Sequence, residues 1–130
     1  MGLAEKQAMA QFKEKQYPEW HKKLTTALGK PIEVTFEDMT FTTVDGVRNL
    51  PSCFFDRFTA DVAAICKDKL GKEAMQGAVK SVCVKYTSTP KEFKLDLTEG
   101  VFTITAKWDG SPGTDCPGAG NYKTFFMSKL

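Results

Sequence analysis

Strict alternation of apolar and polar residues in the last third of the chain is the feature that most constrains the fold. Successive side chains of a strand point to opposite faces of a sheet, so this pattern predicts strands with one buried and one solvated face. The apolar positions are Val82, Val84 and Tyr86; Phe93, Leu95 and Leu97; and Phe102, Ile104, Ala106 and Trp108. Thr98-Glu99-Gly100 predicts a hairpin between the last two sets. Residues 32–36 alternate in the same way and predict a further strand.

Two other stretches have apolar residues at the spacing of three and four that is typical of amphipathic helices. Residues 3–29 predict a helix interrupted at Pro18, and Gly29-Lys30-Pro31 predicts its end, because glycine accepts a left-handed cap and proline cannot continue the helix. Residues 52–70 predict a second helix. Residues 122–127 predict a last short strand, which follows a long loop rich in Gly, Pro, Ser and Asp.

The order of these elements predicts an α+β fold. We expect the N-terminal helix and the second helix to pack on one face of a curved antiparallel sheet of about four to five strands. A length of 130 residues fits a single globular domain, residues 1–130, that can bury a core without obligatory cross-links. The balance of 18 Lys plus Arg against 16 Asp plus Glu lacks the basic excess of nucleic-acid-binding proteins. No apolar stretch approaches the roughly 18 residues of a membrane span.

Four cysteines, Cys53, Cys66, Cys83 and Cys116, have two interpretations. They are reduced thiols in an intracellular protein, or two disulfides in an exported protein, periplasmic or secreted, whose leader has been removed. Cys53 and Cys66 lie roughly 20 Å apart along the predicted helix, which is too far for a disulfide. Two pairings remain: Cys53–Cys116 with Cys66–Cys83, or Cys53–Cys83 with Cys66–Cys116. We favour the first because the loop cysteine can reach the start of the helix, although Cys83 alternates with the residues expected to face that helix.

Other chemistry has little support in the sequence. The cysteine spacing contains no close Cys-x-x-Cys pair, so we expect no metal site. No phosphate-binding or dinucleotide-binding motif is present, so we expect no cofactor. The only histidine, His21, is interpreted as a surface residue rather than the base of a nucleophilic cysteine.

The C-terminal tripeptide Ser128-Lys129-Leu130 has the form of a peroxisomal import signal. Chance alone also produces this ending, and the sequence shows no positively charged and apolar leader at its start. An exported, an intracellular and a peroxisomal location therefore all remain open.

Ten Phe, three Tyr and two Trp make the chain rich in aromatic residues. Together with the scarcity of catalytic groups, this predicts a small non-catalytic binding module that presents an apolar cavity or surface to a hydrophobic ligand or protein partner. The residues expected to line such a site are Trp20, Phe54, Tyr86 and Trp108.

Two alternatives come from other functional classes. One is a cofactor-independent enzyme, which would use a carboxylate such as Asp38 or Asp109 with Tyr86 or His21 in an apolar pocket. The carboxylate would need a raised pKa. The other is a structural or assembly protein, which would have an exposed strand edge or apolar patch that a second molecule covers.

Overall fold

The computed structural model describes residues 1–130. The helices and strands follow one another in this order: α1 (Leu3–Lys15), α2 (Tyr17–Leu28), β1 (Glu33–Phe36), the 3-10 turn η1 (Asp38–Thr40), α3 (Val44–Arg48), the π-helical turn η2 (Leu50–Phe55), α4 (Asp56–Ile65), α5 (Lys69–Ala78), β2 (Ser81–Tyr86), β3 (Lys94–Thr98), β4 (Val101–Ala106) and α6 (Asn121–Lys129). None of the helices combines the length and apolar character needed to cross a membrane.

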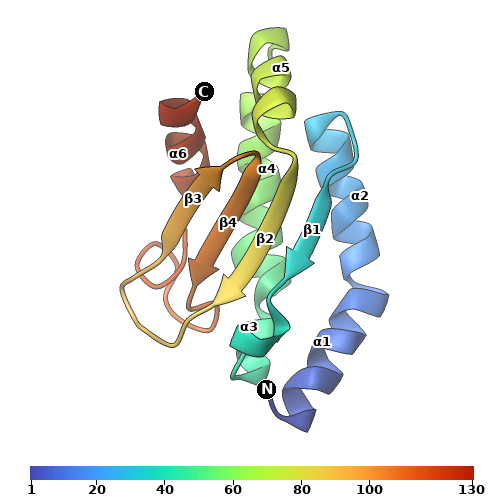
Figure 1. Cartoon of the computed structure of the whole chain (residues 1–130), viewed down its shortest axis with the longest axis vertical. Coiled ribbons are helices and arrows are strands. Elements are labelled where there is room, and N and C mark those ends of the chain that lie inside the picture. Colours follow the sequence, from blue (N-terminus) through green and yellow to red (C-terminus); the bar gives the residue numbers. More distant parts are fainter.

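The four strands form one sheet in the order β1-β2-β4-β3 (Figure 1). The α+β class is confirmed, but only the β3–β4 pair is antiparallel; β1–β2 and β2–β4 are parallel. The chain crosses over through helices between β1 and β2, which returns it to the same end of the sheet and makes that pair parallel. β4 then lies between β2 and β3, so the predicted hairpin at residues 98–100 forms at the edge of a mixed sheet.

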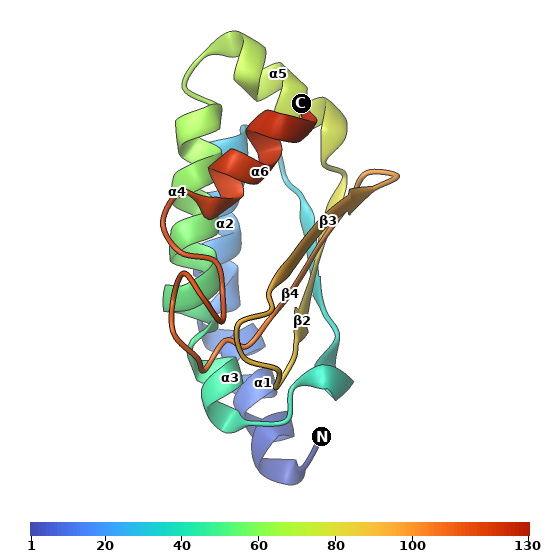
Figure 2. The same ribbon diagram turned by 90° about the vertical axis from the view of Figure 1, so that its left-hand side faces the viewer.

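The helices cover one face of the sheet and leave the other face uncovered (Figure 2). The alternation predicted for β2 and β4 is confirmed, because Val82, Val84, Phe102 and Ile104 are fully buried beneath the helices. The residues between them, including Cys83 and Thr103, pair across the uncovered face. The predicted interruption of the N-terminal helix is also confirmed: α1 ends before Gln16, and Pro18 lies in the first turn of α2.

Residues 122–127 form part of helix α6, so the predicted last strand is wrong. Tyr122 and Phe126 are four residues apart and both fully buried, as they would be on one face of a helix. Asp61 of α4 accepts a hydrogen bond from the backbone N–H of Lys123 at 3.0 Å. This carboxylate satisfies one of the free N–H groups in the first turn of α6, an interaction that only the tertiary structure provides.

The predicted second helix is divided. The π-helical turn η2 precedes α4, which ends at Ile65, and α5 begins at Lys69 as a separate helix. The division occurs at Asp68, whose carboxylate accepts a hydrogen bond from the Gly71 N–H at 2.6 Å and caps α5. An aspartate in this position starts a helix more readily than it continues one.

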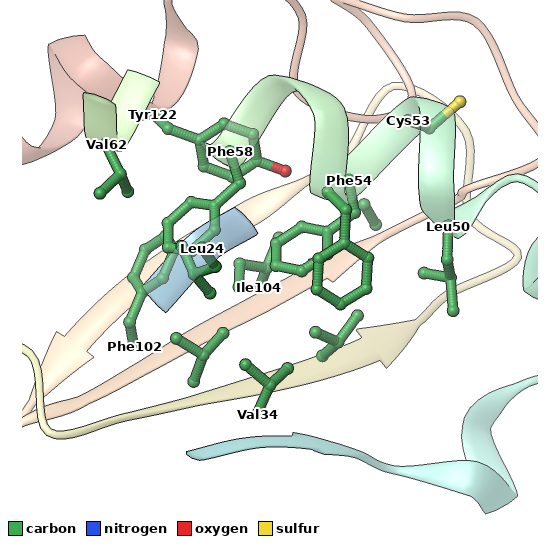
Figure 3. Close-up of a cluster of buried hydrophobic side chains, with 14 of the residues drawn as sticks. Leu24, Val34, Leu50, Cys53, Phe54, Phe58, Val62, Phe102, Ile104 and Tyr122 are labelled. Atoms are coloured by element: carbon green, nitrogen blue, oxygen red, sulfur yellow. The ribbon is translucent and has the colours of Figure 1, made fainter. Parts of the chain in front are cut away.

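Buried apolar side chains form one cluster of 27 residues between the helices and the sheet. Figure 3 shows its centre, where the ring of Phe58 lies between Phe54 and Phe102, with centroid separations of 5.2 and 5.5 Å. Tyr122 of α6 packs edge-on against Phe58 at 5.3 Å. The aromatic contacts therefore join η2, α4, β4 and α6 into one core.

Candidate functional site

Cys53 lies in the π-helical turn at the start of the long helical segment. Its neighbours Leu50, Phe54 and Phe55 are fully buried in the core, whereas Cys53 is 8% exposed and its sulfur points away from the buried rings (Figure 3). A π-helical turn rotates the side chains relative to a regular α-helix and is frequent at functional sites. The turn allows the large apolar residues to enter the core while Cys53 faces outward.

Cys116 lies in the loop between β4 and α6, and hydrogen bonds fix its place. The carboxylate of Asp115 accepts hydrogen bonds from the backbone N–H groups of Lys91 at 2.7 Å and Ser111 at 2.8 Å. The Gly113 N–H donates to the carbonyl of Cys116 at 2.7 Å. These backbone hydrogen bonds lower the pKa of Asp115, which therefore stays ionised at neutral pH. Cys116 is fully buried although it lies in a loop.

Cys53 and Cys116 are neighbours in the fold. Interaction with the Cys116 thiol is the largest cause that lowers the pKa of Cys53 to about 5. Burial opposes the shift, while hydrogen bonds from Ser52 and Arg57 and the charge of Arg57 add to it. The same interaction raises the pKa of Cys116. The two thiols therefore titrate as a pair, with the pKa of Cys53 lowered and the pKa of Cys116 raised.

Two further polar groups at this place lack partners. Nη1 of Arg57 and the hydroxyl of Tyr122 are both buried without a hydrogen-bond partner. Arg57 follows Cys53 by one helical turn, and the Tyr122 hydroxyl points to the side of the core on which Cys53 lies (Figure 3). Burial raises the pKa of Tyr122 well above its ordinary value, so the hydroxyl remains a donor. We name Cys53, Cys116, Arg57 and Tyr122 the thiol site.

The thiol site has the components of cysteine redox chemistry. A thiolate is the nucleophilic form of cysteine, and a neighbouring cation stabilises it. A second thiol in contact can close an intramolecular disulfide. The low exposure of Cys53 restricts direct access to small reactants.

Of the predicted cysteine pairings, the structure brings together Cys53 and Cys116 and does not bring together Cys66 and Cys83. Cys66 caps the end of α4 on the helical side of the sheet, whereas Cys83 lies on the uncovered face. The sheet therefore separates them. All four cysteines are free thiols in the structure.

The four residues predicted to line an apolar site lie at different depths. Phe54 and Trp108 are fully buried with their ring centroids 5.6 Å apart, and the Trp108 Nε1–H donates to the Lys85 carbonyl at 2.9 Å. Tyr86 is also buried. Trp20 is half-buried, stacks on Phe55 and borders a surface depression of 430 Å³. The structure therefore does not gather these four side chains around one cavity.

Asp109, a predicted catalytic carboxylate, accepts hydrogen bonds from the hydroxyls of Thr43 at 2.8 Å and Tyr86 at 2.9 Å. Lys107 lies 3.3 Å from the same carboxylate. Although burial opposes the shift, these hydrogen bonds lower the pKa of Asp109, which is the opposite of what a general acid needs. The other predicted carboxylate, Asp38, forms an exposed ion pair with Lys13 at 2.9 Å.

His21 is held by the sheet rather than free on the surface. Its Nε2 lies 2.7 Å from the carbonyl of Ile32, and the Tyr17 hydroxyl donates to the Val34 carbonyl at 3.5 Å. These α2 side chains occupy backbone acceptors along the outer edge of β1, which protects a strand edge from pairing with another chain. His21 is not among the groups that shift the pKa of Cys53. The tripeptide Ser128-Lys129-Leu130 is exposed at the end of α6.

Sequence reasoning missed Arg57 and Tyr122. One signal was available, because Cys53 and Arg57 are four residues apart on a predicted helix and therefore share a face. Tyr122 gave no such signal, since its segment was predicted to be a strand.

No protein-family model, no curated protein and no solved structure matches this chain.

Proposed function

We propose that this protein is a thiol-based redox protein in which Cys53 and Cys116 alternate between a dithiol and an intramolecular disulfide. The proposal is carried by the proximity of these two cysteines, which is close enough for each to shift the pKa of the other; one comes from η2 and one from a loop that is anchored by hydrogen bonds. Closing the disulfide from the dithiol releases two electrons and two protons, and two external thiols, which are themselves oxidised to a disulfide, return both in the reverse step.

The environment of Cys53 determines how strongly oxidising the proposed disulfide would be. Hydrogen bonds and positive charge stabilise the thiolate, and therefore the reduced form, which makes a disulfide more oxidising. Once Cys53 has been oxidised, it no longer accepts the Cys116 hydrogen bond, and the largest cause of the raised Cys116 pKa disappears. Cys116 can then lose its proton and attack. We expect a reduction potential between about −270 and −120 mV.

A redox titration tests the proposal. The full chain is equilibrated in dithiothreitol or glutathione buffers of graded potential, free thiols are alkylated in acid, and each cysteine is quantified by peptide mass spectrometry. Cys53 and Cys116 should titrate together in one two-electron transition and give a linked peptide. A C66S/C83S variant is the matched control and should titrate unchanged. Independent alkylation of Cys53 and Cys116 at every potential would refute the proposal.

An apolar binding surface is a second candidate, and one feature favours it. Three exposed apolar side chains, Leu70, Met127 and Leu130, border a depression of 370 Å³ between α4, α5 and α6. This volume suits a small hydrophobic ligand. A fluorescent fatty acid should bind the wild-type chain and lose affinity in Met127→Lys. Leu3→Lys, which places the same charge on an exposed leucine of α1, is the control. Equal binding by all three proteins would rule out this surface.

A further inference from the structure

The two edges of the sheet differ in how they are protected. At the β1 edge, Nε2 of His21 lies 2.7 Å from the Ile32 carbonyl. The Tyr17 hydroxyl donates to the Val34 carbonyl at the same edge. At the opposite edge, β3 has β4 as its only neighbouring strand (Figure 1). Outside the sheet, the backbone of β3 (Lys94–Thr98) makes no hydrogen bond, so this edge is open.

The backbone groups at the open edge belong to alternate residues of β3. Thr98 and Val101 pair directly across the two-residue turn Glu99-Gly100, whose φ angles are 51° and 81°. In a hairpin of this kind the flanking pair is hydrogen-bonded, and such pairs alternate with residues whose backbone N–H and C=O point away from the partner strand. Leu95 and Leu97 therefore direct these groups to the open edge, where an edge strand is a template for pairing with another strand.

The side chains of β3 divide between the two faces of the sheet. Lys94 and Asp96 are exposed on the uncovered face. Leu95 and Leu97 face the helices and are only half-buried at the margin of the core, as is Phe93 just before the strand. Charged residues, especially lysine, commonly keep edge strands from pairing. Here the lysine has an aspartate two residues away, so the strand carries both signs of charge.

One antiparallel register of β3 with a second copy of β3 satisfies all these side chains. Pairing Leu95 with Leu95 of the second copy about a two-fold axis places Lys94 opposite Asp96 of that copy, and the symmetry repeats this pair. On the helical face, Leu97 then lies opposite Phe93. Centring the pairing on Asp96 would oppose two aspartates, and centring it on Lys94 would oppose two lysines. A shift by one residue would exchange the two faces.

We propose that this protein forms a two-fold homodimer through antiparallel pairing of β3, centred on Leu95, which joins the two four-stranded sheets into one continuous sheet. The inference goes beyond the proposed thiol function and does not depend on it. Two strands of five residues make a small contact, so we expect a reversible, concentration-dependent dimer rather than a permanent one. Cross-strand pairs of opposite charge favour this pairing and like charges oppose it, which makes the register testable.

Exchange of charges on β3 is the test. Sedimentation velocity of the full chain, kept reduced to prevent intermolecular disulfides, is measured from about 10 µM to about 1 mM. The wild-type chain should change reversibly from monomer to dimer over this range. Lys94→Asp and Asp96→Lys each replace two attractive pairs with two repulsive ones and should raise the dimer dissociation constant at least about tenfold. The double variant K94D/D96K restores opposite charges and should return to within about threefold of wild type.

Mixing the two single variants checks that they are folded. Lys94→Asp and Asp96→Lys should form a heterodimer with each other, because all the facing charges are then complementary. Glu33→Lys, the same charge reversal at an exposed residue of β1, is the matched control and should dimerise as wild type does. In wild type, the amides of Leu95 and Leu97 should exchange with deuterium more slowly at about 1 mM than at about 10 µM. A chain that stays monomeric, or a dimer that the single variants leave unchanged, would overturn the proposal.

Discussion

The most direct prediction concerns the ionisation of Cys53 and its dependence on Cys116. The contact between the two thiols lowers the pKa of Cys53 from 9.0 to about 5. At pH 7 the thiolate fraction therefore rises about a hundredfold, from about 1% to nearly complete ionisation. Replacing Cys116 with alanine removes the largest cause of the shift, so the Cys53 pKa should rise by at least about one unit.

The assay must measure a midpoint rather than a rate at one pH. The intrinsic nucleophilicity of a thiolate falls as its pKa falls, and the logarithm of the rate changes by about 0.4–0.5 per pKa unit. A pKa lowered by about four units therefore reduces the reactivity of the thiolate by about 40- to 100-fold. This loss nearly cancels the gain in thiolate fraction, and a single rate would conceal the shift. Alkylation of Cys53 should instead be followed from about pH 3 to about pH 10 by peptide mass spectrometry.

The expected profile for the wild-type chain has its midpoint near pH 5. Cys66 supplies an internal contrast, since burial raises its pKa and its alkylation should rise only under alkaline conditions. In the Cys116→Ala variant the Cys53 midpoint should move upward while the Cys66 profile stays fixed. A wild-type midpoint at or above about pH 8, or a midpoint that Cys116→Ala leaves unchanged, would refute the proposed thiol contact.

Three further predictions concern stability. Oxidation of Cys53 and Cys116 closes a loop of about 60 residues and should stabilise the fold by up to about 4 kcal/mol in urea denaturation, a difference that Cys116→Ser abolishes. Asp61→Ala removes the side-chain acceptor at the start of α6 and should lower the free energy of unfolding by about 1–2 kcal/mol; the exposed Asp56→Ala is its control and should lie within about 0.5 kcal/mol of wild type. Because hydrogen bonds lower the pKa of Asp109 in the folded state, its contribution is fully present above its unfolded pKa and lost as pH falls through the lowered value. Thermal scans between about pH 5 and about pH 2 should therefore show a smaller acid-induced loss in Asp109→Asn than in wild type.

Part of the cysteine arrangement could be predicted from the sequence. Helix geometry excluded Cys53–Cys66, and the reach of the loop favoured Cys53–Cys116, two residues that lie near each other in the structure as free thiols. The companion pair, Cys66–Cys83, lies on opposite faces of the sheet, in line with the alternation that counted against it. The roles of Arg57 and Tyr122 were not accessible, because they depend on how α6 packs against α4.

The error at residues 122–127 has a specific cause. Short apolar runs fit a strand and a helix equally well by composition, and the choice is made by what the segment packs against. Here Tyr122 and Phe126 enter the core one turn apart, and Asp61 from α4 satisfies the first turn of the helix. Neither partner is near in sequence.

The sequence by itself determined the local elements: the helix ending at Gly29, the alternating strands, the hairpin at residues 98–100 and the class α+β. These follow from the periodicity of side chains along consecutive residues, which is a local property. The tertiary structure alone decided the parallel pairing of β1, β2 and β4, the helical form of α6 and the meeting of Cys53 with Cys116. Each depends on which distant segments pack together, and burial of the shared core, rather than any local pattern, selects that arrangement.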